Sequence, residues 1–164
     1  MQVYLAGPLF SQAERDWLDG LASSVRAAGL ECFVPHEHFD EIAELTPAEI
    51  YRVDGAGLRA SNALLAWLDG PMIDDGTAAE IGAFAELVRT ADGHHVGIVG
   101  LVTDLRLQRR RGNAPGDGMN LFVTGAIEAA GTICWSVPDA IDALTKLSAF
   151  LADSSSGSDT GSGA

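Results

Sequence analysis

The chain has 164 residues, 47% of them hydrophobic, and its 23 acidic and 10 basic side chains give a formal net charge of −13. This length suits one domain with a buried core, and the composition excludes collagen-like, disordered and disulfide-stapled chains. With a mean hydropathy of +0.14 we expect no membrane span. A chain this acidic repels phosphate backbones, so we expect no nucleic-acid polymer as a partner.

Strand and helix patterns alternate along the sequence. A short apolar run ends at Gly7-Pro8, and a capping-box pattern at Ser11 and Glu14 then begins a helix that Gly29 ends. In chain order, the patterns predict strands at 2–7, 31–34, 63–68, 95–102 and 132–135, helices that begin at residues 12, 47, 77, 120 and 138, and a long polar loop at 104–118.

This alternation predicts an α/β fold, a doubly wound, five-stranded parallel sheet of the flavodoxin or Rossmann type with helices on both faces. We expect one domain at residues 1–152, and a disordered tail at the Ser/Gly-rich segment 153–164. The N-terminus has no basic region typical of a signal peptide, and Cys32 and Cys134 form no CxxC pair. A cytoplasmic location with reduced thiols is therefore expected.

A ligand site in such a sheet is expected beyond the carboxyl ends of its strands. The predicted loops there supply residues 6–10, 35–38 and 69–77, followed by Glu80, and together they predict one strongly acidic crevice. These segments contain no lysine or arginine. The chain also has neither GxGxxG after its first strand nor GxxxxGK[ST], which argues against a dinucleotide or nucleoside triphosphate site.

Carboxylates are the reactive groups that remain. Metal ligation by Asp69, Asp74 and Asp75 is chemically conceivable, but their spacing matches no standard calcium loop, and we expect no metal. Carboxylates do bind sugar hydroxyls, and a carboxylate can attack an anomeric carbon directly. The residues therefore favour carboxylate chemistry on an uncharged, polyhydroxylated ligand.

Three motifs resemble one known family. YLAGPLF at 4–10 followed by SQAERDW, DDGTAAEIG at 74–82 and Met119-Asn120-Leu121 are similar to segments of the nucleoside 2-deoxyribosyltransferase family. The resemblance spans roughly residues 2–137. It implies an enzyme that moves a 2-deoxyribosyl group between nucleobases through a covalent glycosyl-enzyme, with 2′-deoxynucleosides and free nucleobases as substrates, without metal or organic cofactor, in nucleotide salvage.

The resemblance also implies a role for individual residues. Glu80 matches the nucleophile that attacks the anomeric carbon, and Tyr4 matches the tyrosine that orients this carboxylate. Asp54 matches the acid that protonates the departing base. Asp74 matches the carboxylate that binds the sugar 5′-hydroxyl, and Phe10 matches an aromatic residue that packs against the base.

Two further candidates complete this set, and one position departs from the family pattern. Gly7, in the loop after the first strand, is a candidate for substrate binding. Asn120 matches a residue that a neighbouring subunit donates to the 5′-hydroxyl, which implies a homo-oligomer with shared sites. His36 stands where many relatives have glutamine after the proline of the second strand.

Each candidate also has a structural interpretation, which the residues alone leave open. Thr77–Glu80 is itself a capping-box pattern, Tyr4 suits the core of a buried strand, and Asp54 suits a solvated helix surface. Phe10 can be the hydrophobic staple of the first helix, and Asn120 can be a helix cap.

Two alternatives to transfer remain. One is an N-glycosidase that hydrolyses nucleosides or nucleoside 5′-monophosphates, and the other is a non-catalytic nucleoside-binding module. Hydrolase relatives need an arginine shortly after the first motif to hold the phosphate, and here Leu9 and Phe10 stand there. Together with the acidic pair Asp74-Asp75, this favours substrates with a free 5′-hydroxyl.

Overall fold

The computed structural model describes residues 1–41, 44–90, 93–110 and 118–156. Within these ranges the strands are β1 (Gln2–Ala6), β2 (Glu31–Phe33), β3 (Ala63–Trp67), β4 (Gly97–Leu101) and β5 (Gly131–Cys134). The helices are α1 (Gln12–Ala27), the 3-10 helix η1 (Pro35–Glu41), α2 (Pro47–Ala60), α3 (Asp75–Arg89), α4 (Leu105–Arg110), α5 (Leu121–Ala130) and α6 (Val137–Ser156). The predicted alternation of strands and helices is confirmed.

The strands form one parallel sheet in the order β2-β1-β3-β4-β5. The chain therefore leaves β1 toward β2 on one side and returns to β3 on the other. Such a reversal of strand order is the point where ligands bind in open α/β sheets. The predicted doubly wound, flavodoxin-like fold is confirmed.

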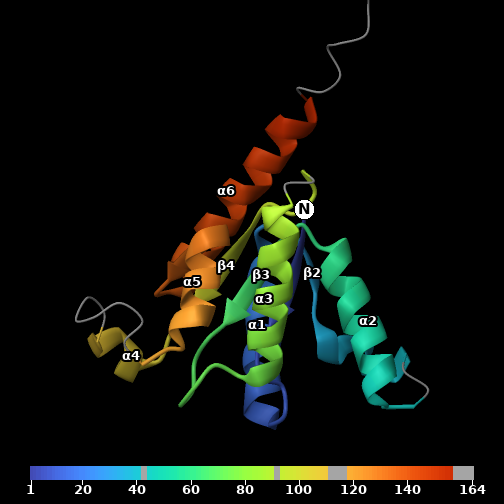
Figure 1. Cartoon of the computed structure of the whole chain (residues 1–164), viewed down its shortest axis with the longest axis vertical. Helices are drawn as coiled ribbons and strands as arrows, with labels where there is room; N and C mark the ends of the chain where they lie inside the picture. The colour runs from blue at the N-terminus through green and yellow to red at the C-terminus, as the bar shows by residue number, and fades with distance from the viewer. Residues whose placement is uncertain (42–43, 91–92, 111–117, 157–164) are drawn as a thin grey trace, which may run out of the picture.

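Helices cover both faces of the sheet, and the apolar core is divided accordingly (Figure 1). Alternate residues of β1 point to opposite faces, as the period of two of a strand requires. Val3 and Leu5 pack with α1 and α6, whereas Tyr4 packs with residues of α2, α3 and α5. The second of these faces therefore carries the candidate residues.

The start of α3 differs from the prediction in a way that concerns the site. The helix begins at Asp75, and Asp74 is its N-cap, with Oδ2 accepting hydrogen bonds from the Thr77 backbone N–H at 2.9 Å and the Thr77 hydroxyl at 3.1 Å. The predicted capping box of Thr77 and Glu80 is therefore wrong, because Asp74 caps the helix three residues earlier. Glu80 has no capping role.

Two other segments differ from their predicted structure. Leu105–Arg110 is a short helix inside the segment predicted as a polar loop. Its residue Leu107 is buried in the hydrophobic core. Helix α6 continues to Ser156, four residues into the predicted tail, and 111–117 and 157–164 lie outside the described residues. None of the described helices combines the length and apolarity that crossing a membrane requires.

Candidate active site

The strongest polar contact on the α2–α3–α5 face joins a tyrosine to a carboxylate. Tyr4 lies in the middle of β1 and has no exposed surface, and Glu80 lies in the second turn of α3. The Tyr4 hydroxyl donates a 2.6 Å hydrogen bond to Glu80 Oε1. Two residues 76 positions apart in the sequence thus meet beside the reversal of strand order, as the resemblance implies.

Burial changes the proton affinity of both partners. It raises the pKa of Glu80 from 4.5 to about 7, against the lowering effect of the Tyr4 hydrogen bond, and the negative charges of Asp54 and Asp74 raise it further. Burial, and then the nearby Glu80 carboxylate, raise the pKa of the Tyr4 phenol well above its usual value. Tyr4 therefore stays a hydrogen-bond donor, and Glu80 titrates near neutral pH.

Asp54 is the second carboxylate of this group. It lies on α2, its charge acts on both Tyr4 and Glu80, and its Oδ1 is buried without a hydrogen bond from any residue in the described ranges. Burial raises its pKa, and the nearby His38 opposes that shift. A carboxyl group in such surroundings holds its proton more readily than an exposed one, which suits a proton donor.

A column of stacked rings holds this region together. Phe33 lies between Tyr4, at a centroid distance of 5.3 Å, and His38, at 4.3 Å, with both ring pairs nearly parallel. A Cβ at Gly57 would lie 2.4 Å from the Phe33 ring, so only glycine lets α2 approach this column. The sequence interpretation missed Phe33 and Gly57, for which the only signal was a glycine inside a predicted helix, and it placed His38 in the crevice segment 35–38 without a role.

Asp74 connects the pair to an open cavity. This cavity of about 430 Å³ lies between the loop after β1 and the loop after β3. Its lining includes Phe10, Glu14, Asp74 and Asp75, and no lysine or arginine is among the lining residues. Phe10 is 74% exposed at its edge and thus does not act as a buried staple.

Two predicted candidates, Gly7 and Asn120, and the family departure at His36 make contacts other than the Tyr4–Glu80 pair. A Cβ on Gly7 would lie 3.0 Å from the Leu18 side chain of α1, so this glycine allows close packing on the opposite face. His36 Nε2 contacts Asp19 Oδ1 of α1 at 2.7 Å, and His38 is the histidine on the site face. Asn120 is the N-cap of α5, with Oδ1 accepting from the Phe122 and Val123 backbone N–H groups.

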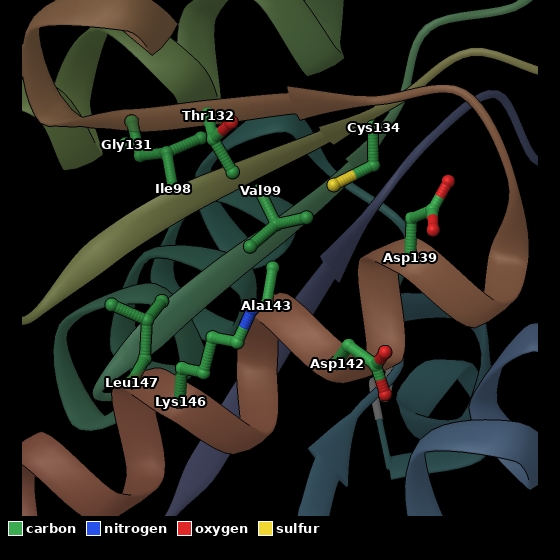
Figure 2. A pocket seen from close by; sticks show the side chains of 10 residues that line it. All are labelled: Ile98, Val99, Gly131, Thr132, Cys134, Asp139, Asp142, Ala143, Lys146 and Leu147. Carbon is green, nitrogen blue, oxygen red and sulfur yellow. The ribbon is translucent and has the colours of Figure 1, made fainter.

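The described residues contain no group of three or more His, Cys, Asp and Glu side chains arranged to hold a metal ion. Asp69, considered above as a ligand, accepts hydrogen bonds from the backbone N–H groups of Thr103 and Asp104 and ties the ends of β3 and β4 together. A separate cavity of about 450 Å³ lies between β4, β5 and α6 and includes Lys146 (Figure 2). It lies on the α6 side, away from Glu80.

The sheet order and the acidic residues at its switch point define a flavodoxin-like α/β protein. The family model described as "Nucleoside 2-deoxyribosyltransferase" matches residues 3–122, and the chain belongs to this family. No curated protein matches the sequence significantly.

Two solved structures show the same fold over almost their whole length. A conserved protein from Enterococcus faecalis V583 is 30% identical, with a TM-score of 0.73 over 89% of this chain and 98% of that one. A 2-deoxyribosyltransferase from Bacillus psychrosaccharolyticus is 17% identical, with a TM-score of 0.63 over 90% of this chain and 96% of that one.

Proposed function

We propose that the protein is a nucleoside 2-deoxyribosyltransferase that works through a covalent glycosyl-enzyme on Glu80. The observation that carries this proposal is the buried 2.6 Å hydrogen bond from Tyr4 to Glu80 Oε1. It orients the carboxylate and leaves Oε2 as the attacking atom. Family membership over residues 3–122 supports the reaction class.

The proposed reaction has two displacements at the anomeric carbon. Glu80 Oε2 forms a bond to C1′ while the bond from C1′ to the base nitrogen breaks, and the electron pair leaves with the base, which takes a proton from Asp54. A second base then attacks C1′, its proton passes to Asp54, and Glu80 is released. Two inversions of configuration at C1′ give net retention of that configuration, and the kinetics are ping-pong.

The substrate is proposed to carry a free 5′-hydroxyl. Asp74, whose charge already acts on Glu80, is the proposed acceptor for that hydroxyl. A 5′-phosphate would enter the adjacent cavity, where Glu14 and Asp75 are present and no basic side chain is among the lining residues. We therefore expect deoxycytidine to have a higher kcat/KM than its 5′-monophosphate, and the opposite order would favour the hydrolase alternative.

The active form is proposed to be a homo-oligomer in which Asn120 reaches the 5′-hydroxyl in a neighbouring site. Asn120 is exposed, and only its Oδ1 is engaged in capping α5, which leaves its amide group as a donor. Mixing inactive Glu80→Ala and Asn120→Ala proteins should restore part of the activity, because some interfaces then pair two intact residues. If mass spectrometry shows mixed oligomers and no activity returns, sites are not shared.

Base exchange is the direct test of the function. The protein is incubated with deoxyinosine and adenine, and the products are separated by liquid chromatography. New deoxyadenosine is the expected result and fits a role in cytoplasmic nucleotide salvage. Hypoxanthine without deoxyadenosine would instead identify an N-glycosidase, and the absence of any product would identify a binding module.

A further inference from the structure

The loop after β1 carries an aromatic ring that the subunit itself does not bury. Phe10 lies in this loop, its side chain is 74% exposed, and it lines the cavity of about 430 Å³ beside Asp74. Its neighbour Leu9 packs against the hydrophobic cluster on the α1 side. Apolar burial inside the subunit therefore explains the position of Leu9 and does not explain that of the Phe10 ring.

Side chains from the start of α1 hold the backbone on both sides of that ring. Arg15 Nη1 donates hydrogen bonds to the carbonyl oxygens of Leu9, at 2.8 Å, and Phe10, at 3.0 Å. Glu14 Oε2 accepts a 2.6 Å hydrogen bond from the Ser11 backbone N–H. Residues 9 to 11 are thus tied to the helix through their main-chain atoms, which fixes the place from which the Phe10 side chain projects.

The guanidinium of Arg15 contacts this loop and does not line the cavity. The ionisable side chains among the cavity-lining residues are all acidic. Nη2 of Arg15 contacts the Gln12 side chain at 3.4 Å, one turn back along the chain. Hydrogen bonds from a guanidinium to carbonyl oxygens are charge-assisted and stronger than those between neutral groups. The two bonds from Nη1 therefore restrain the loop more firmly than a neutral side chain would.

We propose that Arg15 is a positioning residue for nucleoside binding, which holds the Phe10 ring in place through the Leu9 and Phe10 carbonyl groups. An exposed ring on a cavity wall is a platform for a flat aromatic group, and the nucleobase is the flat part of the proposed substrate. A loop that is already ordered loses less conformational freedom when the substrate binds. The inference rests on the proposed function and adds a residue outside the reacting group.

The first test separates KM from kcat in the exchange of deoxyinosine with adenine. Arg15→Gln should raise the KM for deoxyinosine about 10-fold, as expected if the ring then occupies its binding position about a tenth of the time. The kcat should stay within about two-fold, because Phe10 contacts substrate and transition state alike. The matched control is Arg89→Gln, at an exposed arginine paired with Glu86 at the end of α3, which should change neither constant.

A double-mutant cycle tests whether Arg15 acts through Phe10. Phe10→Ala should raise the KM for deoxyinosine about 5–150-fold, the usual range for loss of a base-stacking ring. Adding Arg15→Gln should change that KM by less than about two-fold, because no ring is left to position. Independent, multiplying effects of the two substitutions would overturn the inference, whereas a merely structural role of Arg15 would lower the melting temperature without this coupling.

Arg15→Lys provides a conservative variant. Both carbonyl groups accept from the same nitrogen of Arg15, so one ammonium group can replace it, and the KM should return to within about three-fold of wild type. The second arm compares deoxycytidine with its 5′-monophosphate in Arg15→Gln. A larger loss for the monophosphate would mean that Arg15 turns toward a phosphate, and the inference would be wrong.

Binding measurements distinguish failure of this inference from failure of the proposed function. The dissociation constant of deoxyinosine is measured by calorimetry in a Glu80→Ala background, with and without Arg15→Gln and Phe10→Ala. If wild type exchanges no bases but the same coupling appears in the dissociation constants, Arg15 positions Phe10 and the transferase assignment fails. If wild type exchanges bases and the coupling is absent, or if deoxyinosine does not bind, the role of Arg15 is refuted.

Discussion

The two faces of the sheet bury different kinds of side chain from the same strand, β1. On β1, Val3 and Leu5 face a cluster of buried hydrophobic residues that includes side chains of α1 and α6. Between them, Tyr4 faces the other way and meets Glu80, with Asp54 near enough to affect both. Both faces stabilise the fold through apolar burial, and the second also buries a phenol and carboxyl groups at an electrostatic cost.

The cost on the second face can be expressed through the pKa of Glu80. Because folding raises this pKa from 4.5 to about 7, the folded protein binds the proton more tightly than the unfolded chain. The contribution of Glu80 to the free energy of unfolding is therefore most favourable below pH 4.5. It falls by up to about 3 kcal/mol as the pH rises to about 7. Substitutions on either face test this division between them.

Glu80→Gln should have the largest effect, a loss of exchange activity of about 10⁴-fold or more, because an amide cannot form the glycosyl ester. The variant should also unfold at a higher denaturant concentration than wild type at pH 8, since the buried negative charge is gone. Glu86→Gln, on the exposed side of the same helix, is the control. An active Glu80→Gln protein would refute the nucleophile assignment.

Asp54→Asn should lower kcat by about 10²–10⁴-fold, the usual range for loss of a general acid. The loss should be much smaller for a deoxyriboside whose leaving group departs without protonation. Measuring both substrates separates loss of a proton donor from damage to the site. Equal losses for the two substrates would mean that Asp54 is not the acid.

Tyr4→Phe should lower kcat/KM by about 10–150-fold, because it removes a hydrogen bond to a charged group worth roughly 1.5–3 kcal/mol. Since the Tyr4 hydrogen bond lowers the pKa of Glu80, the acid limb of the pH–rate profile should move to higher pH. Tyr51→Phe, at a residue 76% exposed on α2, should change neither quantity. An unshifted profile would reduce Tyr4 to a core residue.

Leu144→Ala should have the smallest effect on activity and a large one on stability. Leu144 is fully buried in the hydrophobic cluster with α1, and the cavity should lower the free energy of unfolding by about 2–5 kcal/mol. Urea denaturation measures this loss, and kcat should stay within about two-fold at temperatures where the protein is folded. A parallel collapse of kcat would show that the two faces are coupled.

The sequence predicted well what depends on neighbouring residues. The alternation of strands and helices, the capping box at Ser11 and Glu14 and the start of α2 at Thr46-Pro47 are all present. Apolar periodicity and caps act over a few residues, so they can be recognised without the fold. The strand ends placed Glu80 in the predicted crevice, but the roles of Glu80 and Tyr4 came from a family resemblance, because spacing alone favoured a helix cap and a core residue.

Tertiary structure decided which of these residues meet. Tyr4 and Glu80 come together only because β1 pairs with β3 and α3 crosses back over that pair. The turn of η1 sends His36 toward α1 and His38 onto Phe33, which two histidines so close in sequence do not reveal. A strand pattern assigns a side chain to one of two faces, but the partner on that face and the burial that shifts a pKa arise only when distant elements pack.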